Sequence, residues 1–372
     1  METKRHVALD VYRLLCMLLI TTTHIFGYSG LLAHIPYTHV NFYLVSVFDA
    51  LQHFAVNGFV MLSAYFLVGK KETFSRVVRF EIQLIFYALA IFAIAAPLTG
   101  LSSGSSFLYG LVSSLFPLLT NHYWYAICYV ILLLLIPIFN KMITALTQGE
   151  HLALIVILGV ACSVFFHVDP FFNSTDFIGH YTHSLLWFFT LYFITAYIKL
   201  YPIKHPTFFG PVLFALCTLS LTVLVAVKYN VFGIKTAFPI IDSLMISVDL
   251  LSNNSLPALL LSVSSFVTFS QCKPRSETRL SAAFGALVPS FFAIYLIQEH
   301  TLVRSALWSA VNIQKWATDP RLILVVLAVF IGLMIAAALL YGVYYLLNKW
   351  FLGKLASAIC RKVDALARKG NR

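Results

Sequence analysis

Two ionisable residues stand inside the first apolar stretch of the sequence and could do chemistry there. Arg13 and His24 are eleven positions apart. At about 100° per residue, this spacing brings both residues to one face of a helix, separated by roughly 16 Å of rise. A charged group within a membrane span is costly, so a functional role is the first interpretation. In the alternative, Arg13 reaches to the interface and His24 bonds a neighbouring helix.

The residue types in this stretch indicate proton-transfer chemistry. Asp10 lies three positions before Arg13, a spacing that allows an ion pair within one helical turn. Imidazole titrates near neutral pH, so His24 could act as a general base. The 12 histidines show no close ligand spacing, and no metal site is expected.

The elements that must position these residues are apolar helices. Of the 372 residues, 60% are hydrophobic and 10% are charged, whereas soluble domains carry about 25% charged residues. We therefore predict an all-α integral membrane protein, a bundle of about ten transmembrane helices. The apolar runs that could span are residues 9–28, 43–68, 78–98, 122–140, 151–168, 182–200, 207–227, 245–270, 284–303 and 322–347. Residues 105–120 are expected to form a re-entrant or interfacial segment.

Basic residues predict the topology. With the N-terminus inside, 19 of the 25 Lys and Arg residues fall in inner segments and 5 in outer segments. This bias predicts that both termini face the cytoplasm. The net charge of +11 then reflects topology and attraction to anionic lipid, so no nucleic-acid partner is expected. We predict a membrane domain over residues 1–348 and a basic cytoplasmic tail over 349–372, amphipathic like a membrane-surface helix.

Two further pairs could support the chemistry on the outer side. Asp49 and His53 are four positions apart, so the carboxylate could orient the imidazole. A polar contact between helices is the equal alternative for this pair. Glu299 and His300 end one of the spans, where they could assist the reaction or simply be solvated.

Two other groups lie at the ends of predicted spans. Tyr123 and Trp124 open one span, where aromatic residues could bind a ligand or belong to the interfacial belt. A basic group precedes the third span, and guanidinium pairs of this kind suit phosphate groups. Anchoring of the inner end is the plainer alternative. The members of this group are Lys70, Lys71, Arg76 and Arg79.

Taken in order along the chain, these motifs resemble acyltransferase family 3, whose members are integral-membrane enzymes that O-acylate sugars. The matching segments are residues 9–24, with the Arg-ten residues-His spacing, and residues 56–67, 76–79, 123–140, 254–257 and 295–297. The residues of the segments at 56–67 and 123–140 are most similar to those of members that modify cell-surface polysaccharides in Gram-positive bacteria. Ala64 stands where the family has Gly, and Gln298 stands where it has His.

The resemblance implies transfer of an acyl group, most often acetyl, from cytoplasmic acyl-CoA to a hydroxyl of a cell-surface polysaccharide or undecaprenyl-linked sugar. His24 would be the general base or a transient acyl acceptor. Arg13 would guide the pantetheine arm or bind phosphate, and the basic group of residues 70–79 would bind the CoA phosphates. Tyr123 and Trp124 would stack against the sugar. The enzyme would be a multi-pass protein of the plasma membrane.

A transporter or flippase of a lipid-linked sugar or small solute is the alternative from another class. Asp10 and Arg13 would then be gating charges within the membrane. Consumption of acyl-CoA by the purified protein would distinguish the two.

Overall fold

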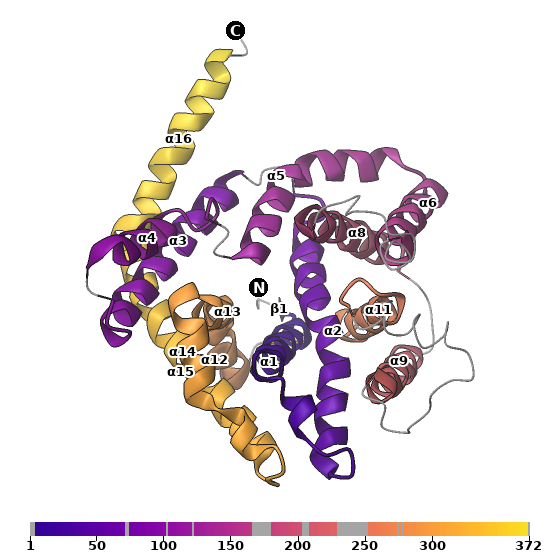
Figure 1. Cartoon of the computed structure of the whole chain (residues 1–372). Helices are drawn as coiled ribbons and strands as arrows, with labels where there is room; N and C mark the ends of the chain where they lie inside the picture. The colour runs from indigo at the N-terminus through magenta and orange to yellow at the C-terminus, as the bar shows by residue number, and fades with distance from the viewer. Residues whose placement is uncertain are drawn as a thin grey trace. The chain divides into compact units, whose positions relative to one another are not determined.

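The described part of the chain folds almost wholly into helices, as the composition predicts. The computed structural model describes residues 4–70, 74–101, 103–120, 123–165, 180–202, 208–228, 252–273, 275–276 and 278–370 (Figure 1). Extended structure within these residues is one antiparallel bridge between β1 (Lys4–Arg5) and β2 (Arg275–Ser276). Two units are present: unit 1 comprises Met1–Val68, Ile143–Val288 and Asn312–Phe330, and unit 2 comprises Gly69–Met142, Pro289–Val311 and Ile331–Arg372.

Unit 1 is arranged around one long helix, α2. Its described helices are α1 (Val7–Ser29), α2 (Val40–Leu67), α6 (Gln148–Gly159), α8 (His180–Leu200), α9 (Phe209–Lys228), α11 (Leu256–Ser270) and α12 (Arg279–Leu287). Shorter helical segments are η1 (Leu31–His34), η2 (Val160–Phe165) and η5 (Ile313–Trp316). Helix α2 packs against α1, α8, α9 and α11, so it is the common wall of this unit (Figure 1).

Close packing of α1 on α2 depends on a glycine. Gly58 of α2 faces Tyr12 and Cys16 of α1, and a Cβ at this position would collide with both side chains. Tyr12 also reaches α11, where its hydroxyl lies 3.0 Å from the hydroxyl of Ser265. Small residues allow helix backbones to approach closely in membrane proteins. Gly58 therefore lets α1 bury its apolar face against α2.

A buried amide ties three helices of unit 1 together. Asn57 is fully buried, and its amide nitrogen donates to the carbonyl of Asn253 at 2.6 Å and to the hydroxyl of Ser262 at 3.0 Å. Its amide oxygen accepts from the indole nitrogen of Trp187 at 2.8 Å. Asn254 continues this network by donating to the carbonyl of Cys162 at 2.7 Å. These bonds fix α2, α8 and the start of α11, because buried amides are costly when unpaired.

Unit 2 is arranged around α3. Its described helices are α3 (Phe74–Leu98), α4 (Gly104–Leu115), α5 (Trp124–Ala145, up to Met142), α13 (Phe291–Glu299), α14 (Thr301–Val311), the second part of α15 (Leu322–Leu347) and α16 (Gly353–Gly370). Helix α3 packs against α4, α13, α14 and α16. Aromatic rings make several of these contacts: the Phe80 and Phe292 centroids lie 5.3 Å apart, and those of Phe92 and Phe107 lie 5.2 Å apart.

Each predicted span contains a helix in its described part, but not all of these helices are long. Residues 122, 166–168, 207 and 245–251 of the predicted spans lie outside the described residues. Among the described residues, six helical runs are long and apolar enough to cross a membrane: Val7–Ser29, Val40–Leu67, Phe74–Leu98, Trp124–Ala145, Ser281–Glu299 and Leu322–Val363. Four shorter apolar helices cover the other predicted spans: Gln148–Ser163, Leu185–Leu200, Gly210–Val223 and Leu256–Ser270. The total of ten spans, and the cytoplasmic placement of both termini, stay predictions.

Two segments have a more definite form than the sequence indicates. The predicted re-entrant or interfacial segment at 105–120 contains helix α4, which packs on α3. The last helix does not end before the basic tail, because α15 runs through the π-helical turn η6 (Asn348–Leu352) into α16. Helix α16 also packs on α3. The tail thus begins as a continuation of the last helix, and its position at a membrane surface stays a prediction.

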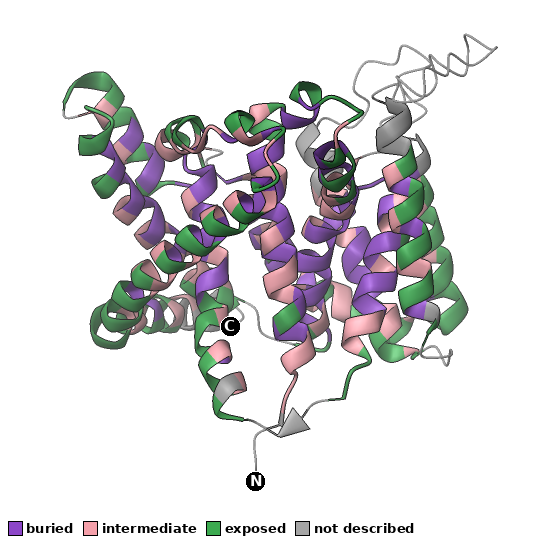
Figure 2. Cartoon of the chain, turned by 90° about the horizontal axis from the view of Figure 1, so that it is seen from below, coloured by how far each residue is buried: buried purple, intermediate pink, exposed green. Residues whose placement is uncertain are grey.

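Apolar side chains cover outer helix faces, as expected for contact with lipid. Figure 2 shows buried and exposed residues on different sides of single helices. On α15, the exposed side includes Leu324, Ile331, Ile335 and Leu339. An exposed apolar surface of this kind is rare on a soluble protein and typical of one that crosses a bilayer.

The substitution Gly58→Ala tests the close contact of α1 and α2. Its new methyl group would push against Tyr12 and Cys16, so we expect a loss of about 1–3 kcal/mol, as in overpacked cores. Thermal unfolding of the detergent-solubilised protein measures it. Gly27→Ala in α1 is the matched control, since a Cβ there meets no described atom within 4 Å. Equal melting temperatures for the two variants would contradict the packing argument.

Candidate active site

Helix α1 carries Arg13 and His24 without interruption. The helix runs from Val7 to Ser29 and ends at Gly30, whose φ of 60° is the left-handed conformation that favours glycine. The three threonines before His24 bond back to carbonyls one turn earlier, with distances of 3.0, 2.8 and 2.9 Å. Their hydroxyls are thus satisfied inside an apolar helix. The predicted placement of both residues on one continuous helix is confirmed.

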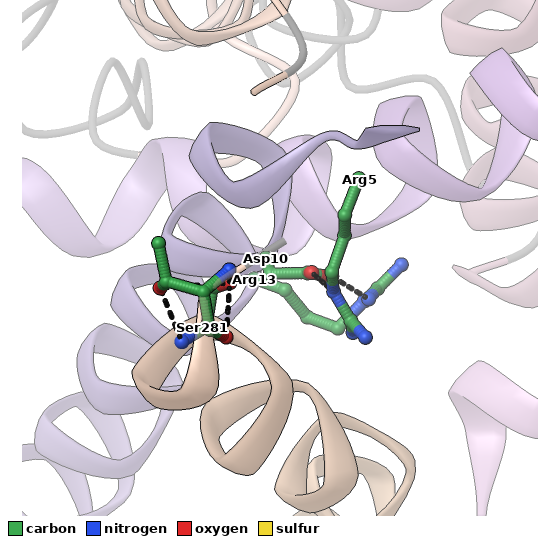
Figure 3. Close-up of polar contacts among 5 residues, drawn as sticks. Arg5, Asp10, Arg13 and Ser281 are labelled. Carbon is green, nitrogen blue, oxygen red and sulfur yellow. Dashed lines mark hydrogen bonds and ion pairs between the residues drawn. The ribbon is translucent and has the colours of Figure 1, made fainter. Parts of the chain in front are cut away.

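The first turn of α1 holds an ion cluster of one carboxylate and two guanidinium groups (Figure 3). Asp10 is buried, and it accepts a hydrogen bond from Arg13 Nη1 at 3.2 Å, which confirms the expected ion pair. It also accepts one from Arg5 Nε at 2.6 Å. The cluster therefore keeps one net positive charge. Because the Arg13 side chain is 22% exposed, its guanidinium stays within reach of a ligand.

The structure adds Arg5 to this site, a residue that the sequence shows only as one more inner-side charge. Arg5 lies in β1, which pairs with Arg275 in β2, just before α12. Its guanidinium passes over Gly285 of α12, where a Cβ would collide with it. Figure 3 shows Ser281, from the first turn of α12, in the same view as Arg5, Asp10 and Arg13. The link to residues some 270 positions later has no local signal in the sequence.

His24 lies three turns beyond the cluster on the same helix. It is partly exposed, and its ring centroid lies 5.6 Å from that of Tyr28, one turn later. At about 1.5 Å per residue, roughly 16 Å of helix separates the backbone of His24 from that of Arg13. The helix thus presents a cationic group and an imidazole at two depths, an arrangement that can bind an anionic group and accept a proton.

Asp49 and His53, the candidate pair on α2, differ in their contacts and burial. Asp49 accepts a hydrogen bond from the amide of Gln52, and His53 is buried. An orienting contact from Asp49 to His53 stays a prediction. Asn57, one turn further, takes part in the helix–helix network described above, which is the structural alternative for this face of α2.

The basic group before α3 lies in unit 2. Arg76 and Arg79 are exposed one turn apart in the first turns of α3, and Lys70 is exposed just before it. Lys71 lies outside the described residues. Asn140 of α5 holds the approach to α3: its amide donates to the carbonyl of Lys70 at 2.9 Å and accepts from the backbone nitrogen of Gly69 at 3.1 Å. Exposed guanidinium groups near a helix N-terminus suit phosphate binding.

A second polar group in unit 2 joins α5, α13 and α14. Glu299 and His300 are both buried, so the alternative that they are merely solvated is wrong. Glu299 forms an ion pair with Arg304 at 3.6 Å. The Nδ1 atom of His300 accepts from the backbone nitrogen of Leu302 at 3.3 Å, which caps the start of α14. Burial of these residues was not evident from their position at the end of a span.

The aromatic residues at the start of α5 belong to the same group. Tyr123 is buried, its hydroxyl donates to the carbonyl of Leu296 at 3.2 Å, and its ring centroid lies 6.5 Å from that of His300. Trp124 is half-buried beside Tyr125. Tyr123 therefore packs inside unit 2 and is not a residue of the lipid-facing belt.

Among the described residues, no three His, Cys, Asp or Glu side chains are grouped so as to hold a metal ion. The candidate residues thus form two sets, each within its own unit. Unit 1 has the ion cluster with His24 and the α2 pair, and unit 2 has the basic start of α3 and the group around Glu299 and His300.

Comparison with known proteins assigns the chain to a family. The family model of the acyltransferase domain of acyltransferase family 3 matches residues 6–352, a range that includes every candidate residue except Arg5. No curated protein and no solved structure matched the chain. The match covers nearly the whole sequence, and its helices include six that could span a membrane among the described residues. The chain therefore belongs to acyltransferase family 3 and is a membrane acyltransferase that transfers groups other than aminoacyl groups.

Proposed function

We propose that this enzyme moves an acyl group, acetyl in the first instance, from cytoplasmic acyl-CoA to a hydroxyl of a cell-surface polysaccharide or undecaprenyl-linked sugar. The observation that supports it best is helix α1, which carries a guanidinium cluster at one end and His24 three turns later. The enzyme would act in the plasma membrane of a Gram-positive bacterium, with both termini in the cytoplasm. The basic inner segments of the sequence support this orientation.

The proposed step needs a base at the acceptor. A sugar hydroxyl is almost wholly neutral at pH 7, so His24 takes its proton as the oxygen attacks the thioester carbonyl. A C–O bond forms and the C–S bond breaks. The CoA thiolate leaves and takes up the proton held by the imidazole, so the reaction is balanced without a further reactant. In a two-step form of the same reaction, His24 accepts the acyl group first.

The donor needs cations. Acyl-CoA carries phosphate groups, and Arg76 and Arg79 with Lys70 are exposed cations at the start of α3. We assign the phosphates to this group and the same task to Lys71. Arg13 guides the pantetheine arm or pairs with one phosphate oxygen. Asp10 holds Arg13 for that role.

Family membership favours this enzyme over the transporter or flippase that the sequence alone also allows. The two differ in what they do to acyl-CoA and to the glycan. A transporter would leave acyl-CoA intact, and its loss would reduce the amount of surface glycan rather than its acylation. Comparison of the surface glycan from the wild type, a deletion strain and His24→Ala separates these outcomes.

Substitution His24→Ala tests the proposed base. We expect acyl transfer to fall by about 10²–10⁴-fold, the usual contribution of a general base, with membrane insertion unchanged. Proton NMR of the surface glycan measures O-acyl groups in cells with the wild type, a deletion or the variant, and acyl-CoA consumption is followed in membranes.

His34→Ala is the matched control, because His34 is exposed and its ring nitrogen bonds the carbonyl of Gly30, one turn earlier, at 3.0 Å. It should leave acylation unchanged. Normal acylation by His24→Ala would remove His24 from the mechanism. A glycan that is less abundant but normally acylated in the deletion strain would instead support the transporter.

Substitution of Arg76 and Arg79 by Ala tests the phosphate assignment. Losing a charge-assisted contact should raise the KM for acyl-CoA about tenfold for each residue, and the KM for the glycan should not change. Steady-state kinetics in membranes, with each substrate varied in turn, gives both constants. Lys315→Ala is the charge-matched control, since Lys315 is an exposed cation of unit 1. A rise in the glycan KM alone would contradict the assignment.

A double-mutant cycle tests whether Gly285 acts through Arg5. Arg5→Ala and Gly285→Ala each disturb the cluster, one by deletion and one by collision, and each should lower kcat/KM about tenfold. The double variant should be no worse than Arg5→Ala, because the collision needs the arginine. Activity assays in membranes measure the four proteins. Fully additive losses would show that Gly285 has a separate role.

A further inference from the structure

Gln298 is buried in unit 2 without a polar partner. It is the next-to-last residue of α13, its exposed fraction is 0%, and neither Nε2 nor Oε1 has a hydrogen-bond partner among the described residues. Buried polar groups in folded proteins are nearly always paired, and an unpaired one is costly. Both ends of the Gln298 amide are therefore left without a hydrogen-bond partner by the part of the chain that the structure describes.

The helix that carries Gln298 is firmly held. Tyr123 donates to the carbonyl of Leu296, two positions before Gln298. The ring of Tyr295, one turn before Gln298, lies 5.9 Å from that of Tyr125 and 6.0 Å from that of Tyr123. The amide is thus presented by a helix that Tyr123 and Tyr125 hold at the start of α5, as a preorganised binding group should be.

The residues that follow Gln298 are already engaged. Glu299 is paired with Arg304, and His300 accepts from the backbone of Leu302 at the start of α14. The ion pair leaves this end of α13 without net charge. This ion pair by itself therefore offers no excess positive charge to a phosphate, in contrast to the exposed cations at the start of α3.

The amide itself indicates the ligand. It offers one acceptor atom and two donor hydrogens, so it is complementary to a neutral group that both donates and accepts. A sugar hydroxyl is such a group. Tyr295, one turn earlier on the same helix, packs its ring against that of Tyr123, and sites with mostly apolar walls and a few placed polar groups are typical for small organic ligands.

We propose that Gln298 is a specificity-determining residue of the acceptor subsite, where its amide donates to one hydroxyl oxygen of the acceptor sugar and accepts from a hydroxyl hydrogen. This assignment rests on the proposed function, in which the acceptor is a sugar. It gives unit 2 a binding role in addition to the phosphate contacts at α3. It also gives a role to a buried amide at a position where an apolar side chain would make the protein more stable.

The near-isosteric substitution Gln298→Met separates a binding role from a structural one. Loss of two hydrogen bonds should raise the KM for the acceptor about tenfold or more and leave the KM for acyl-CoA unchanged. The melting temperature should be equal to that of the wild type or higher, because no partner within the chain is left unpaired. The probes are acetyl-CoA and de-O-acylated glycan from the deletion strain, used with membranes that contain the full chain.

Asn57→Leu is the matched control, since it also replaces a fully buried amide by an apolar side chain of similar size. Three hydrogen bonds would be lost, among them the bond of the buried Trp187 indole nitrogen, so this variant should melt at a lower temperature than the wild type. A lower melting temperature for Gln298→Met would overturn the proposal, because the amide would then be bonded within the protein. A raised KM for acetyl-CoA alone would overturn it too and assign the amide to the pantetheine arm.

The proposed function can fail separately from this assignment. A wild-type enzyme that consumes no acetyl-CoA and acylates no glycan refutes the acyl-transfer proposal and the acceptor subsite with it. Wild-type transfer together with an unchanged acceptor KM in Gln298→Met refutes the role of Gln298 alone.

Discussion

One buried carboxylate organises the start of the candidate site. Asp10 binds Arg13 on its own helix and Arg5 from outside it, so two guanidinium groups are held by one anion. A buried anion needs such partners, because charge taken out of water is costly unless it is paired. The same bonds bring β1, α12 and the first turn of α1 together, since Arg5 pairs along its backbone with Arg275 and crosses Gly285. The position of α1 therefore depends on this cluster.

Hydrogen bonds between helices fix the relative positions of other helices in unit 1. Several helices there are short, such as α6 and α11, and apolar contact with lipid or with a neighbour does not by itself fix their register. The Asn57 amide fixes the register of α2, α8 and α11. It bonds the carbonyl of Asn253 before α11, the hydroxyl of Ser262 in α11 and the indole nitrogen of Trp187 in α8. Gly58, next to it in sequence, allows α1 to approach. Adjacent residues of α2, about 100° apart around the helix, thus serve different neighbouring helices.

Local patterns in the sequence were sufficient for the helices and for contacts within one helix. Hydropathy placed a helix on each predicted span, and residue spacing gave the Asp10–Arg13 pair and the shared helix of Arg13 and His24. Contacts between distant segments could not be predicted in this way. Arg5 pairs along its backbone with Arg275, and the burial of Glu299 and His300 depends on packing within unit 2. A span boundary read from hydropathy cannot show such packing.

Two buried amides with the same chemistry have opposite environments, and the difference is informative. Asn57 satisfies both ends of its amide with groups of the chain, so its hydrogen bonds stabilise the native fold. Gln298 satisfies neither end within the described residues and is held on a helix that α5 fixes in place. An unpaired buried amide lowers stability, and binding sites are where proteins tolerate such losses. A ligand hydroxyl could make both missing hydrogen bonds at once. The free energy of these two hydrogen bonds would then contribute to acceptor binding and not to the stability of the free protein.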